Sequence, residues 1–289
     1  MKFYIVDAFA EEIFGGNPAG VVILEEGTDF PTEEIMIKTA AELRYSETAF
    51  IKQVSAKAFN VRYFTPVEEV DLCGHATIGS FGALLDAGTI YKGQIYELIT
   101  KAGKLEVELD AEMNEATVFM DMGKAAELNP VKDVEELARV LGIKTEDIGF
   151  EPKLVSTGLP DIMLHIKTKE ALMRMKPDFD ALSKLSEKLK VVGVHAFALS
   201  EEPGIRAYCR NFAPLYGINE EAATGTSNGA LTYYLYKQNI IKKGDTSTFL
   251  QGESMGRPSK ILTILDCDNP KKIKVGGTYK ILAKGALFI

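Results

Sequence analysis

The chain has 289 residues, enough for two compact domains, and its 46% hydrophobic and 26% charged residues are the balance of an ordinary folded protein. The 33 basic against 41 acidic residues leave a net charge of −8, which argues against nucleic acid as a partner because phosphate binding requires clustered Lys and Arg. Three widely spaced cysteines argue against a disulfide framework and fit a reducing cytoplasm. The sequence has neither a long apolar run nor a basic leader, so we expect no membrane span and no signal peptide.

Strands predominate in the first half of the chain. Residues 2–9 and 20–24 are rich in Val, Ile and aromatic residues, which predicts strands. Two glutamates in the first turn favour a helix at 32–43. Residues 76–85 (ATIGSFGALL) are apolar or small all round, so we expect a helix that is buried on every side. Further strands are predicted at 48–52, 60–64, 94–100, 105–109 and 116–121.

The second half repeats this order of motifs. Arg210-x-Phe212-x-Pro214 matches Arg62-x-Phe64-x-Pro66, and Gly225 precedes a predicted helix as Gly74 does. We therefore expect two copies of one fold. The boundaries are set at 1–124 for the first half, 125–275 for the second, and 276–289 for a C-terminal strand that packs back on the first half. In the second half the predicted elements are helices at 133–141, 177–189 and 227–238 and strands at 162–166 and after 196.

The starts of the two equivalent buried helices are the strongest candidate for a binding site. They read Cys73-Gly74-His75 and Thr224-Gly225-Thr226. A helix N-terminus carries unpaired backbone N–H groups and a partial positive charge, and glycine lets a ligand approach that backbone closely. Because clefts form where duplicated domains meet, the two helix starts are expected to bind a carboxylate or an enolate-like oxyanion together.

Several motifs carry a resemblance to a known family. They are the runs Gly16-Asn17-Pro18-Ala19-Gly20, Ser46-Glu47-Thr48-Ala49-Phe50, Leu72-Cys73-Gly74-His75-Ala76-Thr77, Arg210-Asn211-Phe212-Ala213-Pro214, Glu220-Glu221-Ala222-Ala223-Thr224-Gly225-Thr226 and 251–259 (QGESMGRPS). In this order, and over nearly the whole chain, they resemble the PhzF-like phenazine-biosynthesis isomerase family. The resemblance implies an α+β, diaminopimelate epimerase-like fold with two pseudo-symmetric halves, each a curved, mostly antiparallel sheet around a central helix. It also implies a homodimer.

The resemblance further implies an acid/base isomerisation of a small carboxylate-bearing metabolite, with neither metal nor organic cofactor. The family's proton carrier, the Glu of its S-E-[ST] motif, corresponds to Glu47, and the His of its G-H-[AP] motif corresponds to His75. Its E-D-P-A-T-G-S segment has an Asp where this chain has Glu221 and a Ser where it has Thr226. Because the side chain of Glu221 is longer than that of the family's Asp, we do not expect this chain to share the family's standard substrate.

The predicted site therefore has two groups of residues. Glu47, His75 and Glu221 are expected to be catalytic. Gly74, Gly225 and Thr226 are expected to bind substrate through the helix starts, and Asn17 and Cys73 are expected to contact it from neighbouring segments. No metal ligand set is expected.

Two other functions stay open on the sequence. In cofactor-independent epimerases of the same fold, two cysteines act as base and acid; Cys73 resembles the first, but the second position is Thr224, a much weaker acid. Cys73 also fits the purely structural role of a small, buried hydrophobic side chain. The other alternative is a non-catalytic protein that binds carboxylates.

Some residues favour structural roles. Residues 225–229 spell G-x-S-x-G, but no buried strand precedes Ser227 and no His follows it, so we interpret them as small residues at a tight helix start. His165 lies within an apolar stretch and is expected in the core, whereas the sequence leaves the role of His195 open. Arg62 and Arg210 are equivalent in the repeat, which favours scaffold pairing with carboxylates.

Overall fold

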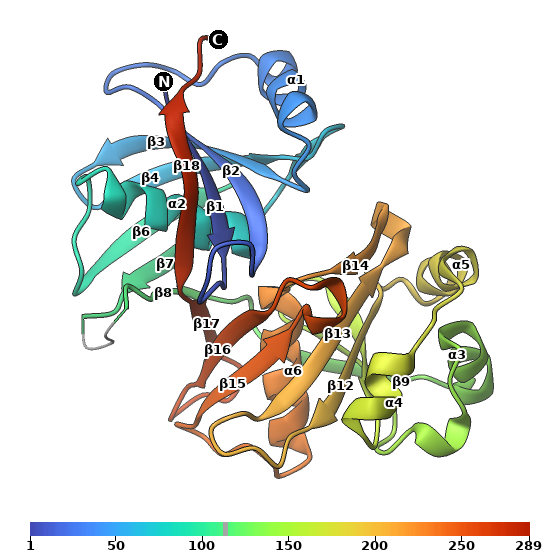
Figure 1. The fold of residues 1–289 in the computed structure, drawn as a ribbon. Coiled ribbons are helices and arrows are strands. Elements are labelled where there is room, and N and C mark those ends of the chain that lie inside the picture. The colour runs from blue at the N-terminus through green and yellow to red at the C-terminus, as the bar shows by residue number, and fades with distance from the viewer. Residues whose placement is uncertain (112–114) are drawn as a thin grey trace. The chain divides into compact units, whose positions relative to one another are not determined.

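The computed structural model describes residues 1–111 and 115–289, and the chain divides into two compact units. Unit 1 comprises Met1–Asp121 and Gly276–Ile289, and unit 2 comprises Met122–Val275. In each unit a curved sheet surrounds one central helix, labelled α2 in unit 1 and α6 in unit 2 (Figure 1).

The sheet of unit 1 is mostly antiparallel, with parallel pairs between β2 and β3 and between β4 and β6. Its C-terminal strand pairs antiparallel with β1, so the last strand of the chain lies beside the first (Figure 1). The elements of unit 1 are β1 (Lys2–Ala8), β2 (Asn17–Ile23), α1 (Glu33–Leu43), β3 (Thr48–Ser55), β4 (Ala58–Phe64), β5 (Glu69–Val70), α2 (Gly74–Asp86), β6 (Gln94–Thr100), β7 (Gly103–Leu109), β8 (Val118–Asp121) and β18 (Tyr279–Ala286).

Unit 2 repeats the same pattern of strand pairing. Parallel pairs join β11 to β12 and β13 to β15, at the positions that β2–β3 and β4–β6 hold in unit 1. Its elements are β9 (Ala126–Pro130), α3 (Val134–Leu141), β10 (Lys153–Ser156), β11 (Pro160–His165), α4 (Lys169–Arg174), α5 (Phe179–Leu189), β12 (Val194–Leu199), β13 (Ala207–Ala213), β14 (Ile218–Glu221), α6 (Gly225–Lys237), β15 (Thr246–Gln251), β16 (Ser259–Leu265) and β17 (Ile273–Gly277), the last of which continues into unit 1.

The repeated pairing confirms that the chain contains two copies of one α+β fold. The turns after the outer helices repeat as well. Arg44 directly follows α1 and Lys190 directly follows α5, and both adopt a left-handed conformation, with φ of 60° and 57°. The structure adds α4, which sequence analysis did not predict because six residues are too few to show a helical period.

The central helix α2 is buried along its length, as predicted from its apolar and small residues. Every residue from His75 to Leu84 is buried. Gly82 lies against the ring of Tyr279 on β18, where a Cβ atom would come within 2.5–2.7 Å of ring carbons. The glycine therefore lets the helix approach the sheet closely.

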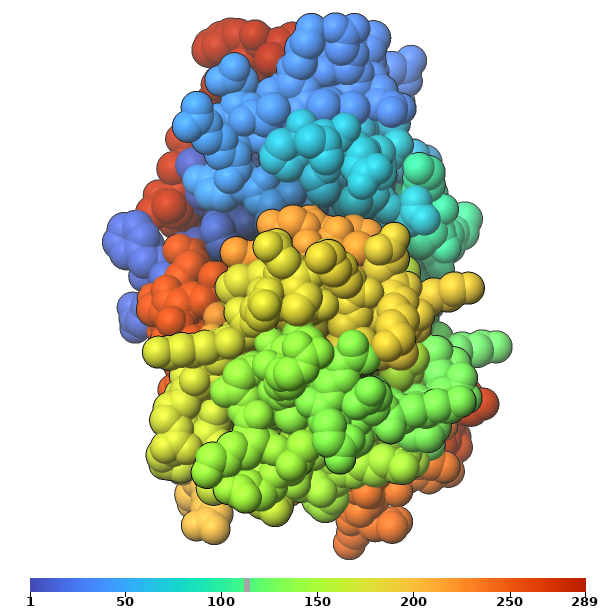
Figure 2. Space-filling view, turned by 90° about the vertical axis from the view of Figure 1, so that its right-hand side faces the viewer, coloured from blue at the N-terminus to red at the C-terminus, as the bar shows by residue number. Residues whose placement is uncertain are grey.

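The outer face of each sheet is covered by other helices. In unit 1, α1 packs Met36 and Ala40 against Phe50 and Phe64 of the sheet. In unit 2, α3, α4 and α5 enclose a larger apolar cluster that includes Leu137, Leu172 and Leu182, and these helices form the surface of unit 2 in Figure 2. Among residues 1–111 and 115–289, no helix is both long and apolar enough to cross a membrane.

Candidate active site

Three separate segments of unit 1 bring Asn17, Glu47 and His75 together. Asn17 is the first residue of β2, Glu47 directly precedes β3, and His75 is the second residue of α2. Because β2 and β3 pair in parallel, their N-terminal ends lie at the same edge of the sheet, and α2 begins at that edge. His75 is only 3% exposed and Asn17 only 5%.

The ring of His75 has polar neighbours at both nitrogens. Oε2 of Glu47 lies 3.2 Å from its Nε2, and the hydroxyl of Ser46 lies 3.4 Å from the same nitrogen. The side-chain nitrogen of Asn17 lies 3.2 Å from Nδ1. In the sequence Ser46 stands out only as part of a motif, and its position beside Glu47 is the one signal for this contact.

Burial determines the charge of His75. It lowers the pKa of the imidazole below its ordinary value, and the nearby Glu47 carboxylate only partly opposes this effect. The ring is therefore neutral at physiological pH. Oε2 of Glu47 is buried and accepts no hydrogen bond from the residues that the structure describes.

Cys73 lies beside the same ring. Its Sγ is 3.4 Å from Nδ1 of His75 and 3.9 Å from Nε2. Potential ligand atoms of Glu47, Cys73 and His75 lie within 4.8 Å of one another, which raises the question of a metal site. A thiolate, an imidazole nitrogen and a carboxylate oxygen are all groups that bind zinc, so these three side chains could hold a metal ion as well as carry out acid/base chemistry.

The starts of the two central helices differ from those of the outer helices. Thr32, Asp133, Thr168 and Asp178 cap the four outer helices with their side chains. In contrast, the N-cap residues Cys73 of α2 and Thr224 of α6 make no side-chain capping bond.

Backbone N–H groups at an uncapped helix start are suited to bind an anion. In unit 1, Gly74 and His75 occupy this position. In unit 2 the same position at the start of α6 is occupied by Gly225, which is buried, and Thr226, which is partly buried.

In unit 2 a network of side chains holds Glu221 in place. The hydroxyl of Thr224 donates a 2.5 Å hydrogen bond to its Oε2. Gln251, which is fully buried, donates to the carbonyl of Glu221 and to the hydroxyl of Thr224, and it accepts from the backbone N–H of Thr224. Asn228 donates to the same Gln251 oxygen. Gln251 was quoted with its motif, but its bridging role depends on tertiary contacts that the sequence does not show.

The repeat-equivalent arginines form scaffold ion pairs, as predicted. Arg62 makes two hydrogen bonds of 2.8 Å to Glu69 on β5, and Arg210 makes two of 2.8 Å to Glu220 on β14. Arg210 also donates to the backbone carbonyl of Leu172, within α4, and to that of Met175, directly after it. These pairs fix the short strands that precede the central helices, and the second pair fixes the residue next to Glu221.

The other candidate residues have structural roles. Ser227 is 2% exposed and donates to the buried Asp161, so the G-x-S-x-G run is a helix start, as interpreted. His165 accepts from the backbone N–H of Phe150 and stacks between Phe150 and Phe197, which confirms its place in the core. His195, left open by the sequence, is fully buried beside Asn211.

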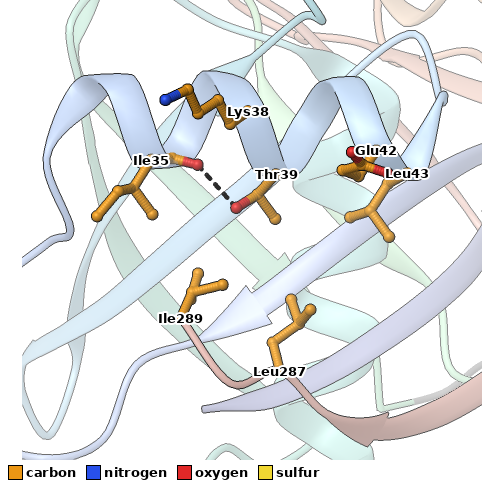
Figure 3. Close-up of a pocket in the computed structure, with 7 residues that line it drawn as sticks. All are labelled: Ile35, Lys38, Thr39, Glu42, Leu43, Leu287 and Ile289. Atoms are coloured by element: carbon orange, nitrogen blue, oxygen red, sulfur yellow. Dashed lines mark hydrogen bonds between the residues drawn. The ribbon is translucent and has the colours of Figure 1, made fainter.

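A separate hollow of about 380 Å³ lies between α1 and the C-terminal segment of unit 1. Ile35, Thr39 and Leu43 of α1 face Leu287 and Ile289 across it (Figure 3). The facing side chains are mostly apolar, and none of the candidate catalytic residues lines the hollow, so it is not part of the candidate active site.

Comparison with known proteins places the chain in a family. The model of the PhzC-PhzF family, described as phenazine biosynthesis-like protein, matches residues 6–285. The chain is 36% identical to an uncharacterized isomerase of Clostridium acetobutylicum, with 100% of this chain and 98% of the relative covered. It is 29% identical to the trans-2,3-dihydro-3-hydroxyanthranilate isomerase of Pseudomonas fluorescens, with 100% and 99% covered.

A crystal structure agrees with this assignment. The PhzF-family phenazine biosynthesis protein of Bacillus anthracis matches with a TM-score of 0.89 at 25% identity, over 100% of this chain and 99% of that one. The fold is the diaminopimelate epimerase-like fold that the motifs predicted. The chain belongs to the PhzF-like family of isomerases.

Proposed function

We propose that this isomerase moves a proton within a small carboxylate-bearing molecule, with Glu47 as the proton carrier and no metal or organic cofactor. The observation that carries the proposal is the buried Oε2 of Glu47, which lies 3.2 Å from the neutral ring of His75 at the uncapped start of α2. A carboxylate in this position can remove a proton from a carbon atom next to an activating group and return it to another atom.

The surrounding groups suit such a step. Removal of the proton leaves negative charge on the substrate, and the partial positive charge at the start of α2 stabilises that charge. Because the ring of His75 is neutral, it can donate or accept a hydrogen bond at a substrate oxygen without adding a full charge. Gly74 leaves space for a ligand to reach the backbone.

For the unit 2 residues we propose roles that follow from the family motif and from their own surroundings. Glu221 is held by Thr224 and by Gln251, and it is proposed to bind a polar group of the substrate or to relay a proton. The backbone N–H groups of Gly225 and Thr226 are proposed to hold a carboxylate.

The reference substrate comes from a relative. Because the Pseudomonas fluorescens relative is named for trans-2,3-dihydro-3-hydroxyanthranilate, this acid is the first compound to test, together with amino acids and cyclic carboxylic acids. Because the side chain of Glu221 is longer than that of the family's Asp, we expect the substrate of this chain to be a related but different acid. The homodimer and the cytoplasmic location expected from the sequence stay predictions.

The decisive experiment is solvent-proton exchange followed by NMR in D₂O. We expect the wild type to incorporate deuterium into its substrate, and Glu47→Gln to lower the rate by a factor of about 10² to 10⁴. Glu68→Gln is the matched control, because Glu68 is an exposed glutamate of the same unit and should leave exchange unchanged. Exchange that persists in Glu47→Gln would contradict the proposal.

One specific observation supports a second candidate function, an epimerase that uses Cys73. The thiol lies 3.4 Å from Nδ1 of His75, close enough for the ring to accept its proton. In that case Cys73→Ala would abolish exchange and Glu47→Gln would not. Tight binding of a carboxylate with no exchange in the wild type would instead indicate a non-catalytic binding protein.

A further inference from the structure

The two nitrogens of the His75 ring face groups of opposite character. On the Nδ1 side lie the side-chain nitrogen of Asn17, at 3.2 Å, and the thiol of Cys73, at 3.4 Å. Both of these groups can donate a hydrogen bond. On the Nε2 side lie Oε2 of Glu47, at 3.2 Å, and the hydroxyl of Ser46, at 3.4 Å.

This arrangement distinguishes the two neutral tautomers of the ring. A neutral imidazole carries one N–H, and a carboxylate can only accept a hydrogen bond. With the proton on Nε2, the ring presents its lone pair to the Asn17 amide and its N–H to the Ser46 hydroxyl, and the Glu47 oxygen lies near that nitrogen without a hydrogen bond to it. With the proton on Nδ1, a lone pair would face the carboxylate and two N–H groups would face each other. The Ser46 hydroxyl can donate to Nε2 or accept from it, so it fits either tautomer. The Asn17 amide and the nearby Glu47 carboxylate therefore determine which tautomer is favoured.

We propose that Asn17 is a positioning residue that holds His75 in its Nε2–H tautomer, with that N–H toward the Ser46 hydroxyl and close to the Glu47 carboxylate. Asn17 is well placed for this task, because it is buried and its register in β2 is fixed opposite Ala8 of β1. The substrate contact expected of Asn17 from the sequence stays a prediction, and the contact with His75 adds the positioning role to it.

The consequence concerns the proton carrier. A lone pair on Nε2 would repel the nearby Glu47 oxygen, whereas an N–H there lets the carboxylate keep its place beside the ring, from which it can reach the substrate. This kinetic part of the inference rests on the proposed function, whereas the tautomer itself does not.

The test is the ¹⁵N NMR spectrum of protein labelled at histidine, in which protonated and unprotonated ring nitrogens give separate signals. We expect His75 of the wild type to carry its proton on Nε2. Asn17→Asp replaces the amide with a group of the same shape that only accepts, so the proton should move to Nδ1 or the ring should become cationic. Asn17→Leu removes the donor, so the tautomer should become mixed.

The second Asn–His pair of the chain supplies an internal control. Asn211 lies 3.2 Å from Nδ1 of His195 in unit 2, and the signals of His195 should stay unchanged in both Asn17 variants if the fold is intact. A wild-type ring with its proton on Nδ1 would overturn the inference, and this result needs no variant. So would an unchanged His75 tautomer in both Asn17 variants.

Kinetics then separate this inference from the proposed function. We expect Asn17→Asp to lower kcat for proton exchange by a factor of about 10 to 100, the size found for groups that orient a histidine at metal sites, with KM little changed. If the tautomer moves but exchange does not depend on Glu47, the proposed function fails and the positioning role of Asn17 stands. If the tautomer does not move, the positioning role fails whatever the kinetics show.

Discussion

Thr224 uses its hydroxyl to hold a carboxylate and not to cap its own helix. The hydroxyl donates to Oε2 of Glu221, and it accepts from Gln251 at 3.1 Å. Thr224→Val keeps the shape of the side chain and removes both bonds. A hydrogen bond to a charged group contributes about 1.5–3 kcal/mol, so we expect proton exchange to slow by a factor of about 10 to 100, measured by NMR in D₂O.

Thr224→Ser is the matched control, because it retains the hydroxyl. We expect it to keep nearly the full exchange rate. A structural role alone would lower the melting temperature of Thr224→Val without a specific loss of exchange. Equal exchange rates in the Val and Ser variants would show that Glu221 does not depend on Thr224.

Two glycines of α2 make different contacts with the sheet around them. At Gly82 a Cβ would lie 2.5–2.7 Å from ring atoms of Tyr279, whereas at Gly79 the nearest atom, in Val6, is 3.4 Å away. We expect Gly82→Ala to lower the free energy of unfolding by about 1–3 kcal/mol through overpacking. Gly79→Ala should be neutral or stabilising by up to about 1 kcal/mol, because alanine is the better helix former.

Urea unfolding followed by far-UV circular dichroism measures both changes. Both variants add one methyl group to the same helix, so a difference between them reports the space at each position. If Gly82→Ala is as stable as Gly79→Ala, the ring of Tyr279 moves aside easily, and close packing of α2 against β18 is not what requires glycine.

Among the helices and strands, the sequence was sufficient to predict an element where a single pattern of residues determined it. The apolar run 76–85 predicted the buried helix α2, and the repeated motifs predicted two copies of the fold. Short elements were missed: α4 has six residues and β5 only two, so neither shows a period.

The candidate site likewise contains residues that the sequence could predict and contacts that it could not. Glu47 and His75 were found because motifs mark them. The bridging role of Gln251 and the contact between Asn17 and His75 join segments that are distant in the chain. Only the folded structure shows them.

For the whole molecule, the buried ionisable groups of unit 2 determine a pH dependence of stability. Burial lowers the pKa of His165 to about 4 and that of His195 to about 3, from an ordinary value of 6.5. Both rings are therefore neutral in the folded protein and take up protons when it unfolds. Burial raises the pKa of Asp161 to about 6 from 3.8, so this group releases a proton on unfolding near pH 5.

The two histidines outweigh the aspartate. Between pH 6.5 and 5 unfolding takes up protons on balance, so the stability present above pH 6.5 is lost as the pH falls. Each proton taken up on unfolding lowers the free energy of unfolding by about 1.4 kcal/mol for every pH unit of acidification. At the lower end of this range, uptake by the two histidines minus release by Asp161 leaves a net uptake of about one proton. We expect these three groups to contribute a decrease of about 1 kcal/mol per pH unit to the free energy of unfolding, measured with urea, and the buried His75 of unit 1, whose pKa is also lowered, to add to that decrease.

Asp161→Asn tests the assignment, because it removes the one group of the three that opposes acid unfolding. Asparagine can still accept the hydrogen bond from Ser227, which limits the loss of packing. We expect the stability of this variant to fall more steeply with acidification than that of the wild type, by about a further 1 kcal/mol per pH unit, whatever its stability at pH 7. Asp268→Asn, at an exposed position, should keep the wild-type slope. An unchanged slope in Asp161→Asn would mean that Asp161 is already ionised in the folded protein, with its charge stabilised by the start of α6.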